Sequence, residues 1–279
     1  MLAHGVSASG PMDNGAFRRA GDWLGGAGST GLEFTQAGLA FRVEQGPLAI
    51  AGDGGDFSIR INGTTKRWPL RVVLKTSDIV DITPGPAGNY GYLRFDREVD
   101  VPMVMGSRAT NSIAGLGGLE GRPLAANGRL SFGPQVPRTL SAHPSAKAHV
   151  QDEPLRVIWG LHADRFPQSV RESFISGTLK VSANLDRMGI RLEDPTAIFA
   201  ASRALSLVSD AIVPGDIQIL GEGTPIILMR DHQPTGGYPR IATVITADLD
   251  RLAQMRPGSV LRFVPVTVAH AQTLSGGKG

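Results

Sequence analysis

Three short apolar runs follow one another in the stretch DIQILGEGTPIILMRDHQPTGGYPRIATVI (residues 216–245), which makes it the main evidence for the fold class. The runs DIQIL, PIILM and IATVI have the length and composition of buried strands. Glycines and prolines between them are typical of turns. The segment DHQPTGGYP (residues 231–239) joins the second run to the third and is rich in polar functional groups. It fits a plain hairpin loop as well as it fits a binding site.

Outward from this stretch, short apolar runs separated by turn residues recur along most of the chain. The run FSIRI (residues 57–61) alternates apolar and polar residues and ends on Asn62-Gly63. This pair predicts a two-residue hairpin turn. The run VLRFVPVTV (residues 260–268) is predicted to be the last strand. The regular spacing of the runs predicts a barrel or a sandwich rather than a parallel sheet with crossover helices.

Helical patterns are few. One follows Asp13, which is a predicted N-cap, and two more lie in DRFPQSVRESFIS (residues 164–176) and ADLDRLAQM (residues 247–255). The sequence therefore predicts a mainly β fold with a few short helices, in two β-rich halves. We expect the halves at residues 1–135 and 155–279, joined by a proline-rich linker at residues 136–154.

Composition excludes several classes of function. The chain has 279 residues, of which 41% are hydrophobic and 19% charged, so a sizeable core is expected. It has no cysteine, which excludes thiol catalysis, disulfides and thiolate metal sites. With 28 basic and 25 acidic residues, and no basic run interleaved with aromatics, nucleic-acid binding is not expected. We expect a cytoplasmic protein without a signal peptide or membrane span.

Five polar loops that contain glycine are the remaining candidates for a site. They are SGPMD (residues 9–13), GSRATNS (106–112), SANLDRMGIRL (182–192), LVSDAIVPGDIQI (207–219) and DHQPTGGYP (231–239). Each loop by itself fits ordinary turn chemistry. Together they match the way in which an all-β scaffold builds a site at its rim. No phosphate-binding loop, no paired histidines for zinc and no biotin-attachment lysine accompany them, so no bound metal or cofactor is expected.

In this order, the loops resemble those of the allophanate hydrolase subunit 2 family, whose close relatives include the C subunit of 5-oxoprolinase. The carboxyltransferase domain of urea carboxylase is similar. The resemblance is carried by GVSASGPMDNGAFRRA, VSANLDRMGIRLE and a long block from VSDAIVPGD to ITADLDRL. It implies a cyclophilin-like β-barrel architecture and a partner, the first subunit of the pair, with a third subunit in 5-oxoprolinase complexes. His232 and Pro234 depart from the family, which commonly has Arg and Thr there.

The resemblance implies three alternative functions. The first is a subunit of an ATP-dependent 5-oxoprolinase, in which the complex uses ATP to open 5-oxoproline to glutamate. The second is a carboxyltransferase subunit that acts on urea or a related amide with biotin held by a partner. The third is a non-catalytic binding or regulatory subunit paired with the first subunit.

Both candidate substrates contain a planar amide or urea group, which requires paired donors and acceptors. Gln233 and Gln218 offer both. Arg187 or Arg108 is suited to stabilise negative charge on oxygen, and Asp186 or Asp231 to accept a proton. The predicted catalytic residues are Asp186, Arg187, Asp231 and Gln233. The predicted substrate-binding residues are Ser9, Met12, Asp13, Arg108, Ser209, Gln218, Thr235, Gly236, Gly237 and Tyr238.

Overall fold

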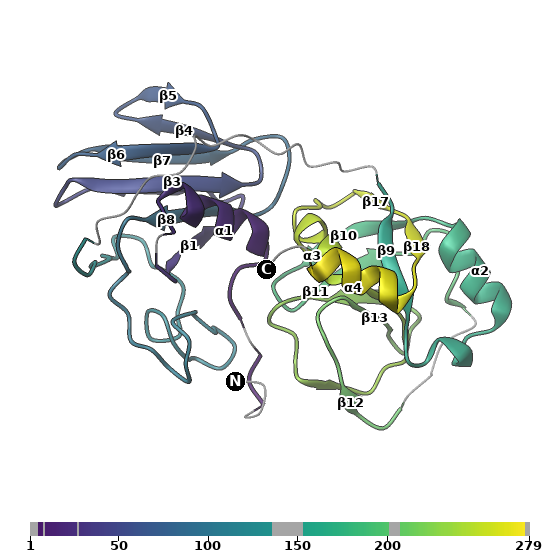
Figure 1. The fold of residues 1–279 in the computed structure, drawn as a ribbon. Coiled ribbons are helices and arrows are strands. Elements are labelled where there is room, and N and C mark those ends of the chain that lie inside the picture. Colours follow the sequence, from purple (N-terminus) through teal and green to yellow (C-terminus); the bar gives the residue numbers. More distant parts are fainter. Residues whose placement is uncertain (1–4, 8, 27, 136–152, 201–206, 277–279) are drawn as a thin grey trace. The chain divides into compact units, whose positions relative to one another are not determined.

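The computed structural model describes residues 5–7, 9–26, 28–135, 153–200 and 207–276. The chain divides into two compact units, which are described one at a time (Figure 1). The first unit comprises residues 9–149, and the second unit comprises residues 1–8 and 150–279. The linker predicted at residues 136–154 lies outside the described residues, apart from Glu153 and Pro154. Its limits stay a prediction.

The first unit is built from one helix and two antiparallel sheets within its described residues. The sheets have the strand orders β1-β8-β3-β6 and β2-β7-β4-β5. The elements are α1 (Asn14–Trp23), β1 (Gly31–Phe34), β2 (Leu39–Arg42), β3 (Leu48–Gly54), β4 (Phe57–Ile61), β5 (Thr64–Lys66), β6 (Leu70–Leu74), β7 (Ile79–Pro84) and β8 (Gly91–Phe95).

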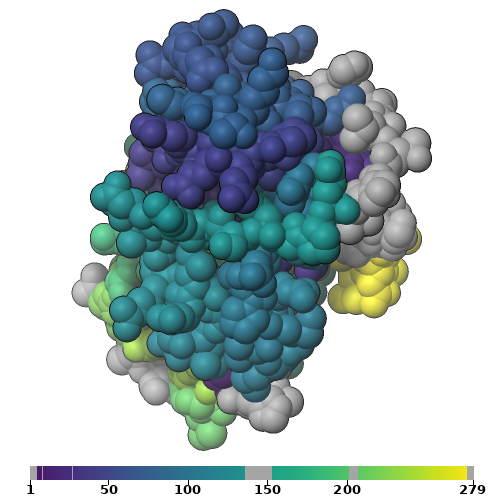
Figure 2. Space-filling model, turned by 90° about the vertical axis from the view of Figure 1, so that its left-hand side faces the viewer, coloured from purple at the N-terminus to yellow at the C-terminus, as the bar shows by residue number. Residues whose placement is uncertain are grey.

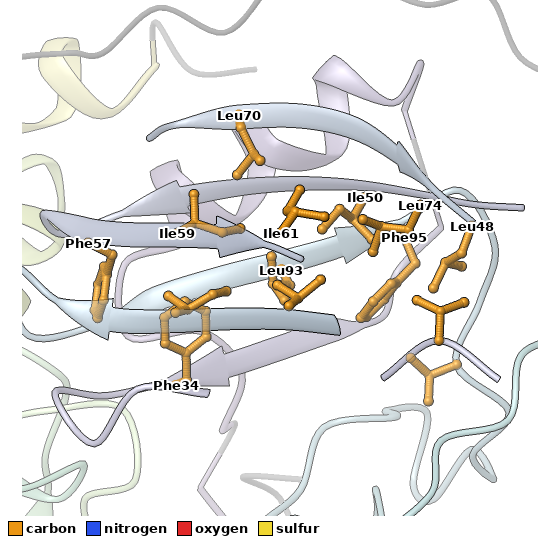
Figure 3. Packing of buried hydrophobic residues seen from close by; sticks show 14 residues of the cluster. Phe34, Leu48, Ile50, Phe57, Ile59, Ile61, Leu70, Leu74, Leu93 and Phe95 are labelled. Atoms are coloured by element: carbon orange, nitrogen blue, oxygen red, sulfur yellow. The ribbon is translucent and has the colours of Figure 1, made fainter. Parts of the chain in front are cut away.

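Alternation of apolar and polar residues sets the faces of these strands. In β4, Phe57, Ile59 and Ile61 are buried whereas Ser58 and Arg60 are exposed, as a period of two requires. Figure 3 shows side chains from both sheets meeting in one core, so the first unit is a β-sandwich. The predicted turn at Asn62-Gly63 is confirmed: it joins β4 to β5, and both residues have a positive φ.

Helix α1 packs on the first sheet through small and aromatic residues. Asp13 caps it, because its carboxylate accepts a hydrogen bond from the backbone N–H of Ala16, and the predicted N-cap is therefore confirmed. Ala20 and Trp23 of the helix pack against Ala51 of β3. The helix covers one face of β3 while Ile50 points into the sandwich core, so nearly every residue of this strand is buried.

The second unit contains an eight-stranded sheet that nearly closes into a barrel. Its strand order is β17-β10-β11-β14-β13-β16-β9-β18. The elements are β9 (Leu155–Trp159), η2 (Ala163–Arg165), α2 (Gln168–Ser176), β10 (Leu179–Leu185), β11 (Gly189–Glu193), β12 (Asp210–Ala211), β13 (Asp216–Ile219), β14 (Pro225–Leu228), β15 (Thr235–Gly236), β16 (Arg240–Val244), α3 (Thr246–Ala253), β17 (Val260–Leu261), β18 (Phe263–Pro265) and α4 (Val268–Gly276).

The end of the chain explains the near-closure of this sheet. Strand β17 pairs with β10 at one edge, and β18 pairs in parallel with β9 at the other edge. Only Arg262 separates β17 from β18 in the sequence, so the two edges of the sheet meet at this point. The mainly β fold with a barrel that the sequence predicted is confirmed.

One predicted element is wrong. The single strand expected at residues 260–268 is two short strands followed by helix α4. The physical reason is that the chain passes from one edge of the sheet to the other at Arg262, which a continuous strand cannot do. Helix α4 then packs beside α3.

Candidate functional site

The second unit carries a cavity of about 490 Å³ on its barrel, a size that suits a small ligand. Its walls come from the neighbouring strands β10, β11, β14 and β13 and from the segment that follows β14. The lining residues are Ala183, Asn184, Leu185, Asp186, Met188, Gly189, Arg191, Gln218, Leu220, Ile226, Leu228, Gln233 and Tyr238. Four predicted site residues are among them, namely Asp186, Gln218, Gln233 and Tyr238.

The turn between β10 and β11 is held by Asp186. Its carboxylate accepts hydrogen bonds from the backbone N–H groups of Met188, at 2.7 Å, and Gly189, at 3.0 Å. Such a bond pattern is the local turn chemistry expected of aspartate. Asp186 therefore fixes the rim of the cavity, and its carboxylate is already engaged as an acceptor.

Arg187 and Asp231 form a two-point ion pair. Arg187 Nε lies 2.7 Å from Asp231 Oδ2, and Arg187 Nη2 lies 3.1 Å from Asp231 Oδ1. The Asp231 side chain is only 2% exposed. The backbone N–H of Asp231 also donates to the carbonyl of Arg187 at 2.7 Å. The pair thus joins the β10–β11 turn to the loop after β14, and neither side chain lines the cavity.

Gln218 on β13 is the cavity residue whose hydrogen bonding is incomplete. The residue is 1% exposed, and its Nε2 is buried without a hydrogen-bond partner among the described residues. Leaving such a group unpaired costs about 1–3 kcal/mol. A Cβ added to Gly236 would lie 2.6 Å from this nitrogen, so glycine is needed there for close packing against Gln218.

The segment around β15 forms a flap, which we define as residues 207–212 and 233–238. Strands β12 and β15 pair within it, and the N–H of Leu207 donates to the carbonyl of Gly237 at 2.8 Å. Gln233 and Tyr238 line the cavity from the flap. Ser209 and Thr235 are exposed and do not line it, and a Cβ on Gly237 would lie 2.9 Å from the carbonyl oxygen of Leu207.

The remaining predicted residues belong to the first unit. The N–H of Met12 donates to Glu33, and the N–H of Asp13 donates to the hydroxyl of Tyr92 at 2.7 Å. Burial raises the pKa of Tyr92 well above its usual value, and the nearby carboxylates of Glu33 and Asp13 raise it further. Ser9 is buried with a positive φ of 54°. Met12 and Asp13 therefore serve a buried polar network at the start of α1.

Arg108 lies in a long irregular segment, residues 99–135, which isolated bridges hold together among its described residues. Figure 2 shows this segment, in blue-green, as a broad part of the first unit's surface. Arg108 is half-buried, and it does not line the cavity of the second unit.

Comparison with known proteins identifies the family. The model of the carboxyltransferase domain, subdomain A and B, matches residues 4–265. The chain belongs to this family. It is 32% identical over 269 residues to the C subunit of 5-oxoprolinase from Escherichia coli, a match that covers 96% of this chain and 85% of that protein.

Relatives of a second kind are much longer. The chain is 30% identical to urea amidolyase of Lachancea kluyveri, over 97% of this chain and 16% of that protein. The crystal structure of urea amidolyase from Kluyveromyces lactis superposes with a TM-score of 0.86 and 27% identity, over 98% of this chain and 18% of that one. The chain thus spans about a sixth of these enzymes, and the resemblance predicted from its loops is confirmed. This member of the carboxyltransferase domain family is related to subunits and domains of enzymes.

Two polar residues of the cavity were not predicted. Asn184 and Arg191 line it, and Arg191 Nη1 lies 4.0 Å from Glu222 Oε1, both side chains being exposed. An exposed pair of this kind contributes at most about 1 kcal/mol, so the guanidinium stays available to a ligand. Both residues lie in SANLDRMGIRL (residues 182–192), so the sequence predicted the loop but not these two side chains.

Within the part of the chain that the structure describes, no group of three or more histidine, aspartate or glutamate residues could hold a metal ion. No helix among the described residues is long and apolar enough to span a membrane.

Proposed function

We propose that this chain is a subunit of a multi-subunit, ATP-dependent 5-oxoprolinase-type amidohydrolase, which converts 5-oxoproline to glutamate. The observation that carries the proposal is the buried amide of Gln218, unpaired among the described residues, in a cavity of suitable size. The sequence similarity to the C subunit of 5-oxoprolinase over nearly the whole chain supports it. Its partners in this proposal are the first subunit of the pair and a third subunit, and the complex uses ATP in the cytoplasm.

The chemistry of the cavity suits a small cyclic amide. The lactam group of 5-oxoproline presents one carbonyl acceptor next to one N–H donor. A side-chain amide such as that of Gln218 or Gln233 offers the complementary pair. The carboxylate of 5-oxoproline would meet the guanidinium of Arg191, which binds carboxylates in a forked geometry. The apolar walls, including Leu220 and Ile226, would cover the ring methylenes.

In this proposal, the residues expected to be catalytic have two different roles, which follow from their contacts. Gln233 faces the cavity and orients the substrate. Asp186, Arg187 and Asp231 already have hydrogen-bond partners within the chain, which favours a positioning role for them. The phosphoryl and proton transfers would then be completed by groups on the partner subunits.

The test is to purify the complex that forms around this chain and to measure glutamate release from 5-oxoproline with and without ATP. In the Gln218→Leu variant, we expect KM for 5-oxoproline to rise about 5- to 150-fold, since an unmatched buried polar group costs about 1–3 kcal/mol. Gln168→Leu, at an exposed position of α2, is the matched control and is expected to leave KM unchanged. Equal KM values in the two variants would remove the cavity from the proposal.

A carboxyltransferase function is the second candidate, favoured by the structural match to urea amidolyase. In that case, carboxybiotin on a partner would donate its carboxyl group to urea or a related amide. Urea-dependent consumption of carboxybiotin by the purified complex, without glutamate release from 5-oxoproline, would select this function. Tight pairing with the first subunit and no turnover of either substrate would select the regulatory role.

A further inference from the structure

One part of the cavity wall is not part of the barrel sheet. Gln233 and Tyr238 reach the cavity from the flap, which the two-stranded β12–β15 pair holds together. Within the flap, the N–H of Ile212 donates to the carbonyl of Pro234 at 3.2 Å. A two-stranded pair is marginally stable by itself. The position of this wall therefore depends on contacts that tie the flap to the barrel.

Arg240 makes such contacts from a strand of the barrel sheet. It lies on β16, where it is the register partner of Gln218 on β13. Its Nη2 lies 2.8 Å from Asp210 Oδ2, and its Nη1 donates to the carbonyl of Ala211 at 2.8 Å. Asp210 and Ala211 are the two residues of β12. One side chain of the barrel thus binds both residues of the flap strand β12.

The barrel end of this connection is buried and hydrogen-bonded. The Arg240 side chain is 9% exposed, and its Nη1 lies 3.4 Å from Asp216 Oδ2. Asp216 is itself buried and accepts hydrogen bonds from the hydroxyl of Thr243 at 2.6 Å and the N–H of Val213 at 3.0 Å. The backbone N–H of Arg240 donates to His162 Nδ1. Because the anchor is buried and the Asp210 side chain is 53% exposed, the contact that breaks first is the one to the flap.

We infer that Arg240 is a positioning residue, which fixes the flap against the barrel and so sets the spacing between Gln218 and the flap residues Gln233 and Tyr238. Arg240 does not itself line the cavity. The inference rests on the proposed function only for the identity of the ligand, 5-oxoproline. The mechanical part concerns this chain alone.

Hydrogen exchange measures the mechanical part without any ligand. In Arg240→Lys, which keeps the charge but loses the forked contacts, we expect exchange of the Leu207 and Ile212 amides to accelerate about tenfold. In Asp210→Ala we expect a two- to fivefold acceleration, because a half-exposed pair contributes little. Asp210→Asn, which keeps an oxygen acceptor, should restore part of the protection. The control is Asp81→Asn, which weakens the exposed Arg60–Asp81 pair of the first unit and should leave exchange of the Leu207 and Ile212 amides unchanged.

The functional part uses the purified complex. In Arg240→Lys we expect KM for 5-oxoproline to rise about tenfold with kcat within a factor of two, because the flap is displaced without loss of a cavity residue. Unchanged exchange at Leu207 and Ile212 in both Arg240→Lys and Asp210→Ala overturns the inference. Accelerated exchange in a complex that does not turn over 5-oxoproline supports the role of Arg240 and refutes the proposed function, so the two failures are distinguishable.

Discussion

Removal of Asp231 should destabilise the second unit strongly, because it leaves Arg187 without its two-point carboxylate partner. The Asp231 side chain is 2% exposed and that of Arg187 is 29% exposed. Breaking a buried ion pair by removing one partner costs about 3–5 kcal/mol. Since nearly a third of the Arg187 side chain reaches solvent, we expect a smaller loss, about 2–3 kcal/mol in the free energy of unfolding.

A double-mutant cycle of Arg187→Met and Asp231→Ala measures this interaction. The assay is urea unfolding monitored by hydrogen exchange of peptides from the second unit, so that the unfolding of the two units is measured separately. We expect a coupling free energy of about 1.5–3 kcal/mol. The Arg60–Asp81 pair, with side chains 53% and 35% exposed, is the control and should couple by less than about 1 kcal/mol. If the coupling free energy of Arg187 and Asp231 is no larger than that of the control pair, the positioning role of these two residues is refuted.

Three further perturbations have expected outcomes. Gly236→Ala places a Cβ 2.6 Å from Gln218 Nε2, so we expect a loss of about 1–3 kcal/mol in urea unfolding and weaker 5-oxoproline binding by calorimetry. Asp13→Ala removes the α1 cap and should cost about 1 kcal/mol, with Asp13→Ser restoring most of it in thermal unfolding. Burial lowers the pKa of His162, and the charges of Arg240 and Arg165 lower it further. Folding thus favours the neutral imidazole. The contribution of this group to the stability of the fold is complete above the unfolded pKa of about 6.5 and is lost as pH falls towards the lower pKa of the folded state. In His162→Gln, the pH dependence of unfolding below pH 6.5 should flatten, and an unchanged slope would contradict this assignment.

Local signals made much of the fold predictable. The alternation in β4, the Asn62-Gly63 turn and the Asp13 cap all depend on residues close together in sequence, and each is confirmed. The sequence does not predict helix α4, because the β-branched residues of VLRFVPVTV (residues 260–268) favour one continuous strand. The Thr267 hydroxyl accepts a hydrogen bond from the His270 N–H, so a capping signal was present in the sequence.

The site was predictable only in part, because its geometry depends on distant pairs. Gln218 and Gln233 were expected from their chemistry, and both line the cavity. The pairing of Arg187 with Asp231 joins residues 44 positions apart, and no local sequence pattern predicts it. The contact of Arg240 with Asp210 spans 30 positions and likewise depends on the strand order of the barrel.

The side-chain amide of Gln218 gives the most direct test of whether the cavity of the second unit binds a small planar amide. The measurement is a nuclear magnetic resonance titration of the full chain with 5-oxoproline, observing the side-chain amide signals of Gln218 and, as a control, Gln168. We predict a saturable shift of the Gln218 signals that is absent in Gly236→Ala, and no shift at Gln168. Gln218 signals that stay in place at millimolar 5-oxoproline, in the chain alone and in its complex, would show that the cavity does not bind this lactam.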